Sequence, residues 1–174
     1  MIWKFITFFV RKLDPEIAHK ITIKFLKLGL HPRLNKIGIP INIGNLIFKN
    51  FIGVAAGFDK NAEVINKIHF LNFGFTEVGT ITPMPQYGNP KPRIFRLEKD
   101  EALINRLGFN NHGSEIVAQR ISENKPQGIL GINIGPNKET KNKSEDFYIC
   151  LSKLYFYLVA SAGLEPALPK GQGF

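Results

Sequence analysis

The pattern of hydrophobic and polar residues changes near residue 40 of the chain. Before this point, apolar side chains recur with a period close to that of an α-helix; beyond it, short apolar runs alternate with amphipathic stretches. The first pattern predicts helices with a broad apolar face, and the second predicts buried strands joined by helices. The chain is therefore expected to comprise a helical N-terminal part and an α/β part.

The first predicted helix covers residues 1 to 12, MIWKFITFFVRK. At 100° per residue its apolar side chains fall on one broad arc, with Lys4, Thr7 and Arg11 on the other side. The segment is too short to span a bilayer, which takes about 20 apolar residues, and no small-residue cleavage site of a secretory signal follows it. We interpret it as an amphipathic helix on a surface.

The second predicted helix begins after Asp14 and ends near Leu28. Asp14 suits the N-cap, Pro15 the first helical position, and Gly29 the end of the helix. Apolar residues cover most of the circumference, lysines form one charged stripe, and His19 projects from the apolar arc. Two such helices favour a hairpin that lies on a membrane or encloses an apolar ligand, although both could instead pack on the domain that follows.

Strands and helices alternate in the rest of the chain. The turn residues Gly44-Asn45 predict a β-hairpin between Ile41 to Ile43 and Leu46 to Phe48. The alternation that follows predicts a parallel α/β architecture, without indicating whether the sheet closes. In chain order we expect a strand from Ile52 to Ala55, a helix from Ala62 to Leu71, a strand from Phe75 to Ile81, a helix from Ser114 to Asn124, a strand from Gly128 to Ile134 and a helix from Glu145 to Val159.

The formal net charge of +9 is concentrated at the N-terminal end. Residues 1 to 50 contain nine lysines and arginines against two carboxylates, a surplus of seven. A basic end beside apolar residues favours an anionic membrane surface over nucleic acid, with a plain solvated basic surface as the alternative. A single cysteine, Cys150, and four scattered histidines favour a reducing compartment and no bound metal.

Candidate chemistry lies on three loops that follow predicted strands, where parallel α/β folds form their ligand sites. Taken singly, their glycines could serve turn geometry and their lysine could be solvated. Together they carry small residues, amides and one lysine, with no paired carboxylates, Ser/His/Asp set or Walker loop, which favours a polar planar cofactor over hydrolysis. The first loop runs from Ala55 to Lys60. The second runs from Gly79 to Pro83 and continues through Arg93 and Arg96 to the segment Asn105 to Asn111. The third runs from Gly131 to Lys138.

Five stretches of the chain carry a specific resemblance to a known family. They are LDPEIAHK, AAGFDKN, FGFTEVGTITPMPQYGNPKPRIFRL, INRLGFNNHG and GINIGPNK, and they keep the family's order and spacing to about Tyr157. In these stretches the chain resembles the class 2, quinone-linked dihydroorotate dehydrogenases. The resemblance implies a (β/α)8 barrel that holds FMN, of which this chain would form the first three to four βα units. A helical hairpin that forms a quinone channel at the membrane would precede the barrel.

The resemblance also implies an activity and its site. Dihydroorotate would be oxidised to orotate through FMN, with a quinone as the acceptor, in pyrimidine (UMP) synthesis at the cytoplasmic face of the cell membrane. By position, the FMN-binding residues are Ala56, Gly57, Phe58, Asp59, Lys60, Thr80 and Asn133; the substrate-binding residues are Lys60, Asn105, Arg106, Leu107, Gly108 and Phe109; and His19 and Arg96 lie beside the quinone channel. No metal and no nucleic acid are implied.

The end of the chain departs from the family pattern. After the fourth barrel strand the family carries a serine base within an Asn-x-Ser-Ser-Pro-Asn-Thr type of loop, whereas this chain reads LVASAGLEPALPKGQGF after Tyr157. Ser161 lacks that context, so no catalytic residue is assigned. We expect three parts: a membrane and quinone-channel hairpin over residues 1–40, the N-terminal part of the FMN-binding barrel over 41–158, and a non-family tail over 159–174.

Three hypotheses about function follow from these patterns. The leading one is a truncated copy of a dihydroorotate dehydrogenase, which by itself would not oxidise dihydroorotate because it lacks a base for the substrate proton. The alternative is a non-catalytic fragment that acts at most as a membrane-surface binding module. The third, a different flavin or phosphate-ligand barrel enzyme, is disfavoured by the length of the matched stretches.

Overall fold

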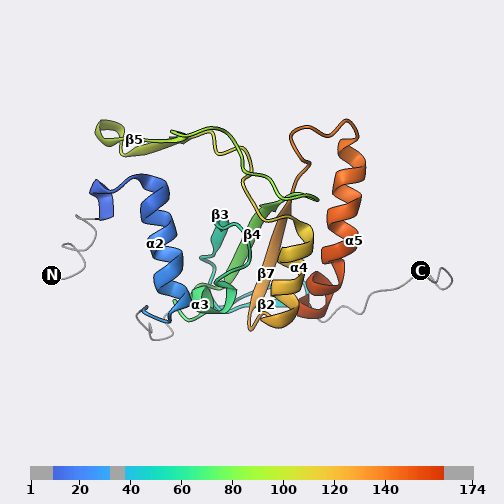
Figure 1. Cartoon of the computed structure of the whole chain (residues 1–174). Helices are drawn as coiled ribbons and strands as arrows, with labels where there is room; N and C mark the ends of the chain where they lie inside the picture. Colours follow the sequence, from blue (N-terminus) through green and yellow to red (C-terminus); the bar gives the residue numbers. More distant parts are fainter. Residues whose placement is uncertain (1–9, 32–37, 163–174) are drawn as a thin grey trace.

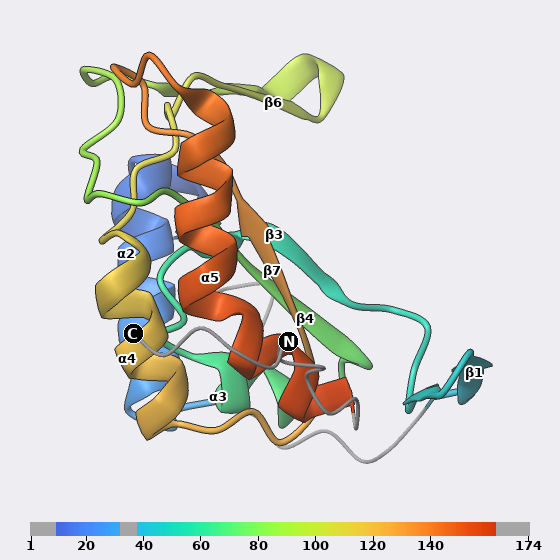
Figure 2. The same ribbon diagram turned by 90° about the vertical axis from the view of Figure 1, so that its right-hand side faces the viewer.

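The computed structural model describes residues 10–31 and 38–162. Its central feature is a parallel sheet, with α2 (Pro15–Lys27) on one side and with α4 (Ser114–Glu123) and α5 (Lys143–Ala162) on the other (Figures 1 and 2). Most of the first predicted helix, residues 1–9, and the last part of the predicted tail, residues 163–174, lie outside the described residues.

Three strands form the sheet in the order β3 (Val54–Asp59), β4 (Phe75–Ile81) and β7 (Ile129–Ile134), and all pairs are parallel. The short helix α3 (Ile65–His69) follows β3, α4 comes before β7, and α5 follows β7. The predicted parallel α/β architecture is thus confirmed. A spatial order of strands that follows the chain order is also the order of consecutive units in a β/α barrel.

Two apolar clusters hold the helices in place. The larger joins β4 and β7 to α4 and α5, and its fully buried side chains include Val78, Val117 and Ile121. The smaller brings Ile23 of α2 together with Ile68 of α3. One face of α2 therefore packs on the α/β part, as one of the two alternatives from the sequence proposed, while its other face stays exposed.

Local signals in the N-terminal part of the chain are confirmed. The side chain of Asp14 accepts hydrogen bonds from the backbone amides of Glu16 and Ile17, at 2.9 and 3.1 Å, and α2 begins at the next residue. The predicted hairpin forms from β1 (Ile41–Ile43) and β2 (Leu46–Phe48), which pair in antiparallel fashion. Capping and turn chemistry are encoded by neighbouring residues, so a local pattern suffices to predict them.

The boundaries of β3 and α3 differ from the prediction. β3 starts at Val54 instead of Ile52 and continues to Asp59, so most of the first predicted loop belongs to the strand. The next helix starts only at Ile65 because Ala62 takes a left-handed conformation, with φ 56°, and the carboxylate of Asp59 binds the backbone amides that follow this turn.

A second hairpin was missed in the sequence. It consists of β5 (Ile94–Leu97), a 3-10 turn (Glu98–Asp100) and β6 (Ala102–Asn105), paired in antiparallel fashion. Figure 1 shows it above the N-terminal end of α2. Every residue of β6 is exposed, so the alternation of buried and exposed positions that marks a strand is absent.

Candidate functional site

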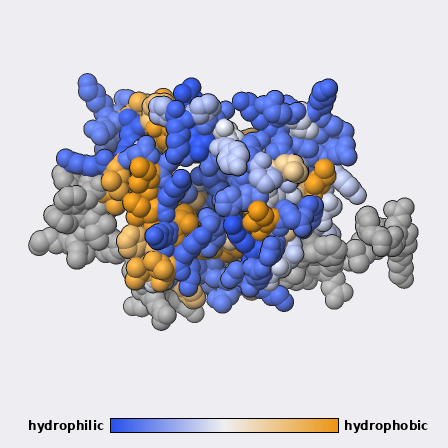
Figure 3. Space-filling view, viewed as in Figure 1, coloured by the Kyte–Doolittle hydropathy of each residue, from blue (hydrophilic) through white to orange (hydrophobic). Residues whose placement is uncertain are grey.

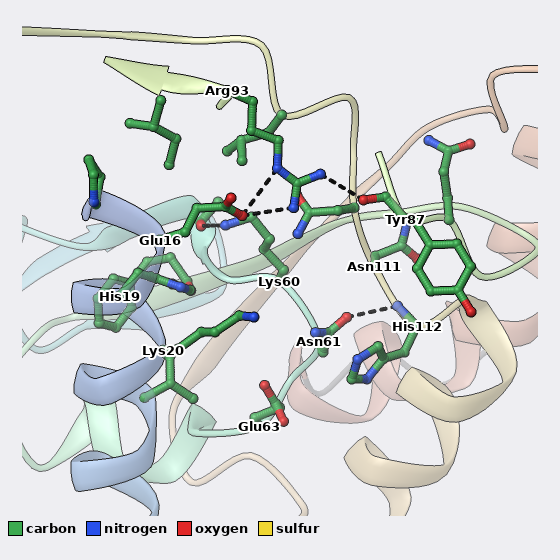
Figure 4. A pocket seen from close by; sticks show the side chains of 18 of the residues that line it. Glu16, His19, Lys20, Lys60, Asn61, Glu63, Tyr87, Arg93, Asn111 and His112 are labelled. Atoms are coloured by element: carbon green, nitrogen blue, oxygen red, sulfur yellow. Dashed lines mark hydrogen bonds and ion pairs between the residues drawn. The ribbon is translucent and has the colours of Figure 1, made fainter. Parts of the chain in front are cut away.

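A cavity of about 840 Å³ opens between α2, the carboxyl end of β3, the segment of residues 85–96 and the first turn of α4 (Figure 4). Cations outnumber carboxylates on its walls, which favours an anionic ligand. The charged residues that line it are Glu16, Lys20, Lys24, Lys27, Lys60, Glu63, Arg93 and Arg96.

His19 faces this cavity from α2. Its Nε2 lies 2.6 Å from the backbone oxygen of Phe58, and the two rings meet edge to face with centroids 5.6 Å apart. Because a carbonyl oxygen only accepts hydrogen bonds, Nε2 carries the proton. Burial lowers the pKa of His19 and outweighs the opposing effect of the Phe58 hydrogen bond, which favours the neutral ring at neutral pH.

Lys60 also lines the cavity, just past the end of β3. Its Nζ donates a hydrogen bond to the backbone oxygen of Gly57 at 2.6 Å. Burial lowers the pKa of Lys60, and the nearby carboxylate of Glu16 opposes this shift. Gly57 has a φ of +104°, and a Cβ built on it would meet no atom within 4 Å. The strand end thus offers one cation beside an open face of backbone.

Asp59 is a structural group in this arrangement. Its side chain is almost fully buried, and its two oxygens accept the backbone amides of Glu63 and Val64, each at 2.8 Å. Burial raises the pKa of Asp59, and these hydrogen bonds partly offset the rise. Its carboxylate therefore fixes the turn that presents Lys60.

A second polar group crosses all three strands of the sheet. The hydroxyl of Thr80 on β4 donates to Oδ1 of Asn133 on β7 at 2.7 Å. Glu77, also on β4, accepts from the Asn133 amide and from the backbone amide of Ala56 on β3, each at 3.4 Å. Residues predicted from three separate loops thus meet across β3, β4 and β7.

The segment of residues 105–109 reaches both the cavity and the polar group around Thr80. Leu107 lines the cavity. Phe109 lies near Thr80, because a Cβ placed on Gly135 would be 2.8 Å from Cγ2 of Thr80 and 3.9 Å from the ring of Phe109. Gly108 and Phe109 have positive φ values of 71° and 51°. Of the predicted substrate residues, Asn105, Arg106, Gly108 and Phe109 do not line the cavity.

Arg96 and His19, predicted together beside a quinone channel, line the same cavity. The guanidinium of Arg96 donates from Nη1 to the backbone oxygens of Arg11 and Leu13, at 2.7 and 2.6 Å. It therefore holds the chain that leads into α2. Ala56, Asp59, Thr80 and Asn133, predicted at the cofactor, lie outside the cavity, with only Gly57, Phe58 and Lys60 of that set on its wall.

Three residues were given no individual role in the sequence analysis, although Arg93 and Asn111 lie in the second candidate loop. Arg93 is buried and pairs with Glu16, and Asn111 is buried and binds the backbone amides of Thr82 and Gly113. Glu77 could have been found, because a carboxylate within the apolar strand FTEVGTI is unusual. The other two gain their meaning from partners distant in sequence. Within residues 10–31 and 38–162, no group of three or more His, Cys, Asp or Glu side chains could hold a metal ion.

The neutral state of His19 generates a prediction about pH. Its pKa is lowered in the folded state, so the unfolded chain takes up the proton first as the pH falls below about 6.5. The stability that neutral His19 contributes is present above this pH and is lost as the pH falls towards the folded pKa. In urea unfolding at about pH 7.5 and about pH 5.5, the parent chain should lose unfolding free energy at the lower pH, and His19→Gln should lose less. An equal loss in His19→Gln and the parent chain would contradict a half-buried neutral His19.

Comparison with known proteins identifies the family. The family model described as dihydroorotate dehydrogenase matches residues 39–162. The dihydroorotate dehydrogenase (quinone) of Bartonella henselae is 55% identical over 150 residues, which are 85% of this chain and 41% of the relative. The protein of the same name from Buchnera aphidicola subsp. Schizaphis graminum is 46% identical over 162 residues, 86% of this chain and 48% of the relative.

Solved structures agree. The crystal structure of DHODH from Eimeria tenella in complex with ferulenol has a TM-score of 0.78 and 42% sequence identity, and the match covers 83% of this chain and 42% of that one. The chain spans about two fifths of the length of the two Bartonella relatives. Because the family model matches most of its residues, the chain belongs to the dihydroorotate dehydrogenase family, and the relatives described here are named as its quinone enzymes.

Proposed function

We propose that the chain contributes part of the FMN and dihydroorotate site of a quinone-linked dihydroorotate dehydrogenase, which oxidises dihydroorotate to orotate in pyrimidine (UMP) synthesis. The observation that carries this proposal is the meeting of Ala56, Thr80 and Asn133 across three parallel strands, with Lys60 and the open backbone of Gly57 at the first strand end. Parallel β/α folds bind their ligands at the carboxyl ends of the strands.

The residues present fit a flat polar cofactor. No atom of the described residues lies within 4 Å of a Cβ built on Gly57, which leaves room for a planar ring against the backbone, and the Thr80 hydroxyl and the Asn133 amide would offer hydrogen bonds to such a ligand. FMN, when bound, supplies a ring that accepts the hydride of the substrate. The protein's part is to hold that ring in one orientation and to exclude water from its reacting face.

Lys60 and the segment from Asn105 to Phe109 are proposed to bind the substrate. Dihydroorotate carries a carboxylate, and a partly buried ammonium group interacts with an anion more strongly than a solvated one does. Within residues 10–31 and 38–162, the ammonium group of Lys60 donates to the oxygen of Gly57, and its three hydrogens leave donor capacity for a ligand. Loss of a proton from the substrate would also need a base, and no described residue is assigned that role.

The quinone and the membrane are proposed to meet the chain at α2. His19 and Arg96 line one side of the cavity, and Ile17, Phe25 and Leu28 on the outer face of the helix are between 50% and 65% exposed. Figure 3 shows apolar side chains gathered on the side of the molecule where α2 lies. Apolar surface beside lysines is typical of peripheral binding to an anionic membrane, which supports the proposed location at the cytoplasmic face of the cell membrane. No helix in the described part of the chain has the length and hydropathy needed to cross a bilayer.

Replacement of Lys60 tests the substrate site. With excess FMN present, Lys60→Ala should bind orotate about 10- to 100-fold more weakly in calorimetric titration, because a hydrogen bond to a charged group contributes roughly 1.5 to 3 kcal/mol. Lys141→Ala, which removes an exposed lysine, is the matched control. Equal orotate affinity of Lys60→Ala and the parent chain would show that this side chain does not bind the substrate. A parent chain that binds no orotate would count against the proposed function as a whole.

Membrane attachment is tested with the same chain. It should sediment with vesicles that contain anionic lipid, and raising the salt concentration should weaken the attachment without abolishing it. Replacing Phe25 and Leu28 together with serine should reduce the bound fraction, since both lie on the exposed face of α2. Tyr148→Ser removes an exposed aromatic side chain from α5 on the opposite side and should leave binding unchanged. Equal binding by the double variant would exclude this face of α2 as the contact.

A further inference from the structure

Arg93 connects α2 to the segment between β4 and β5. It is a buried arginine, with 8% of its side chain exposed, and its partner Glu16 in the first turn of α2 is 12% exposed. Nε and Nη2 donate to Glu16 Oε1 at 3.1 and 2.7 Å, while Nη1 donates to the backbone oxygens of Tyr87 and Asn89 at 2.7 and 2.9 Å (Figure 4). One guanidinium therefore binds the helix and the loop at the same time.

The Glu16 carboxylate is held firmly in its charged form. The hydrogen bond from Arg93 is the main cause that lowers the pKa of Glu16, and Lys91, 3.3 Å away, lowers it further against the effect of burial. A carboxylate in the first turn is also favoured by the helix dipole. Removing one member of a buried ion pair leaves the other charge uncompensated, which is strongly destabilising at that place.

The loop that Arg93 holds packs directly on the proposed substrate segment. The backbone amide of Asn89 donates to the oxygen of Leu107 at 3.0 Å, and its side chain donates to the oxygen of Arg106 at 2.8 Å. The Arg106 amide in turn donates to the oxygen of Arg93 at 2.9 Å. A Cβ on Gly88 would lie 2.2 Å from the oxygen of Leu107 and 2.8 Å from Nη1 of Arg93. These close contacts leave no room for the two segments to slide past each other.

We propose that Arg93 is a positioning residue that sets the segment from Asn105 to Phe109 by reference to α2. The order of contacts is Glu16, Arg93, residues 87–89, and then residues 106–108. The helix with the proposed quinone side is thus linked to the proposed substrate segment through the Glu16 and Arg93 ion pair and the hydrogen bonds between residues 89–93 and 106–107. A displacement of α2 would be transmitted to the segment from Asn105 to Phe109. The assignment of these two sides rests on the proposed function, whereas the mechanical link does not.

Arg96 lies three residues after Arg93 in the sequence, but the two arginines make different contacts. Arg96 also reaches the N-terminal part of the chain from β5, and its hydrogen bonds within the described residues go to the backbone oxygens of Arg11 and Leu13. Arg93, in contrast, divides its donors between the helix and the loop. A lysine in its place would keep the charge but lose the fixed fork of donors that allows this division.

Hydrogen exchange of the full chain tests the link without any ligand. In both Glu16→Gln and Arg93→Lys, the amides of Asn89 and Arg106 should exchange about tenfold faster or more, because the hydrogen bonds that protect them depend on the ion pair between Glu16 and Arg93. The amides of Val78 and Ile132, in the central strands, should keep their protection. Glu115→Gln, which removes an exposed ion pair with Lys153, is the matched control and should change neither set. Orotate titration of the same samples should show weaker binding in Glu16→Gln and in Arg93→Lys.

Two results would overturn the proposal. If only the amides of α2 exchange faster, Arg93 anchors the helix and does not position the substrate segment. If protection is lost uniformly, including at Val78 and Ile132, the ion pair serves folding in general. A parent chain that fails to bind orotate would count against the proposed function, and the exchange rates of Asn89 and Arg106 would still decide the role of Arg93.

Discussion

Parallel strands place their carboxyl ends at one edge of a sheet, and the described structure depends on this constraint. Three strands in chain order bring Ala56, Thr80 and Asn133 into one hydrogen-bonded group although 77 residues separate the first from the last in the sequence numbering. The helices that join the strands keep this arrangement rigid, because Val78 and Val117 are fully buried between the sheet and α4. The site is thus a product of topology more than of any single loop.

Burial is the main cause of the pKa shifts of three groups near the carboxyl end of β3. It lowers the pKa values of His19 and Lys60 and raises that of Asp59, and all three groups lie at or beside the carboxyl end of β3. His19 and Lys60 line the cavity, and perturbed groups at a cavity are typical of functional sites. Here the roles are divided: Asp59 binds its own backbone, His19 binds the oxygen of Phe58, and Lys60 retains donors for a ligand.

The sequence predicted features whose causes are local. The N-cap at Asp14, the turn at Gly44-Asn45 and the strand Phe75–Ile81 were found because neighbouring residues encode them. The candidate residues from Ala55 to Lys60 were recognised as a group because small residues and one lysine stand together there, but all except Lys60 lie within β3 and not on a loop after it. The start of α3 was placed too early because the left-handed turn at Ala62 depends on the buried Asp59 carboxylate, which no hydrophobic period reports.

Features that depend on distant partners could not be predicted in this way. In the second hairpin, β6 is exposed throughout and shows no alternation of buried and exposed positions. The Glu16 and Arg93 pair joins residues 77 positions apart. In the sequence both residues resemble ordinary surface charges. They form a buried ion pair because α2 packs against the loop before β5. Glu77, in contrast, was detectable as a carboxylate within an apolar strand.

The proposed FMN site is tested most directly by an amide spectrum of the isotope-labelled chain, recorded during titration with FMN. We expect the amide signals of Gly57, Thr80 and Asn133 to shift together and saturate with one affinity, while those of Gln119 and Tyr148 stay in place. Shifts confined to the charged stripe of α2, or none at the three strand positions, would contradict an FMN site at the carboxyl ends of β3, β4 and β7.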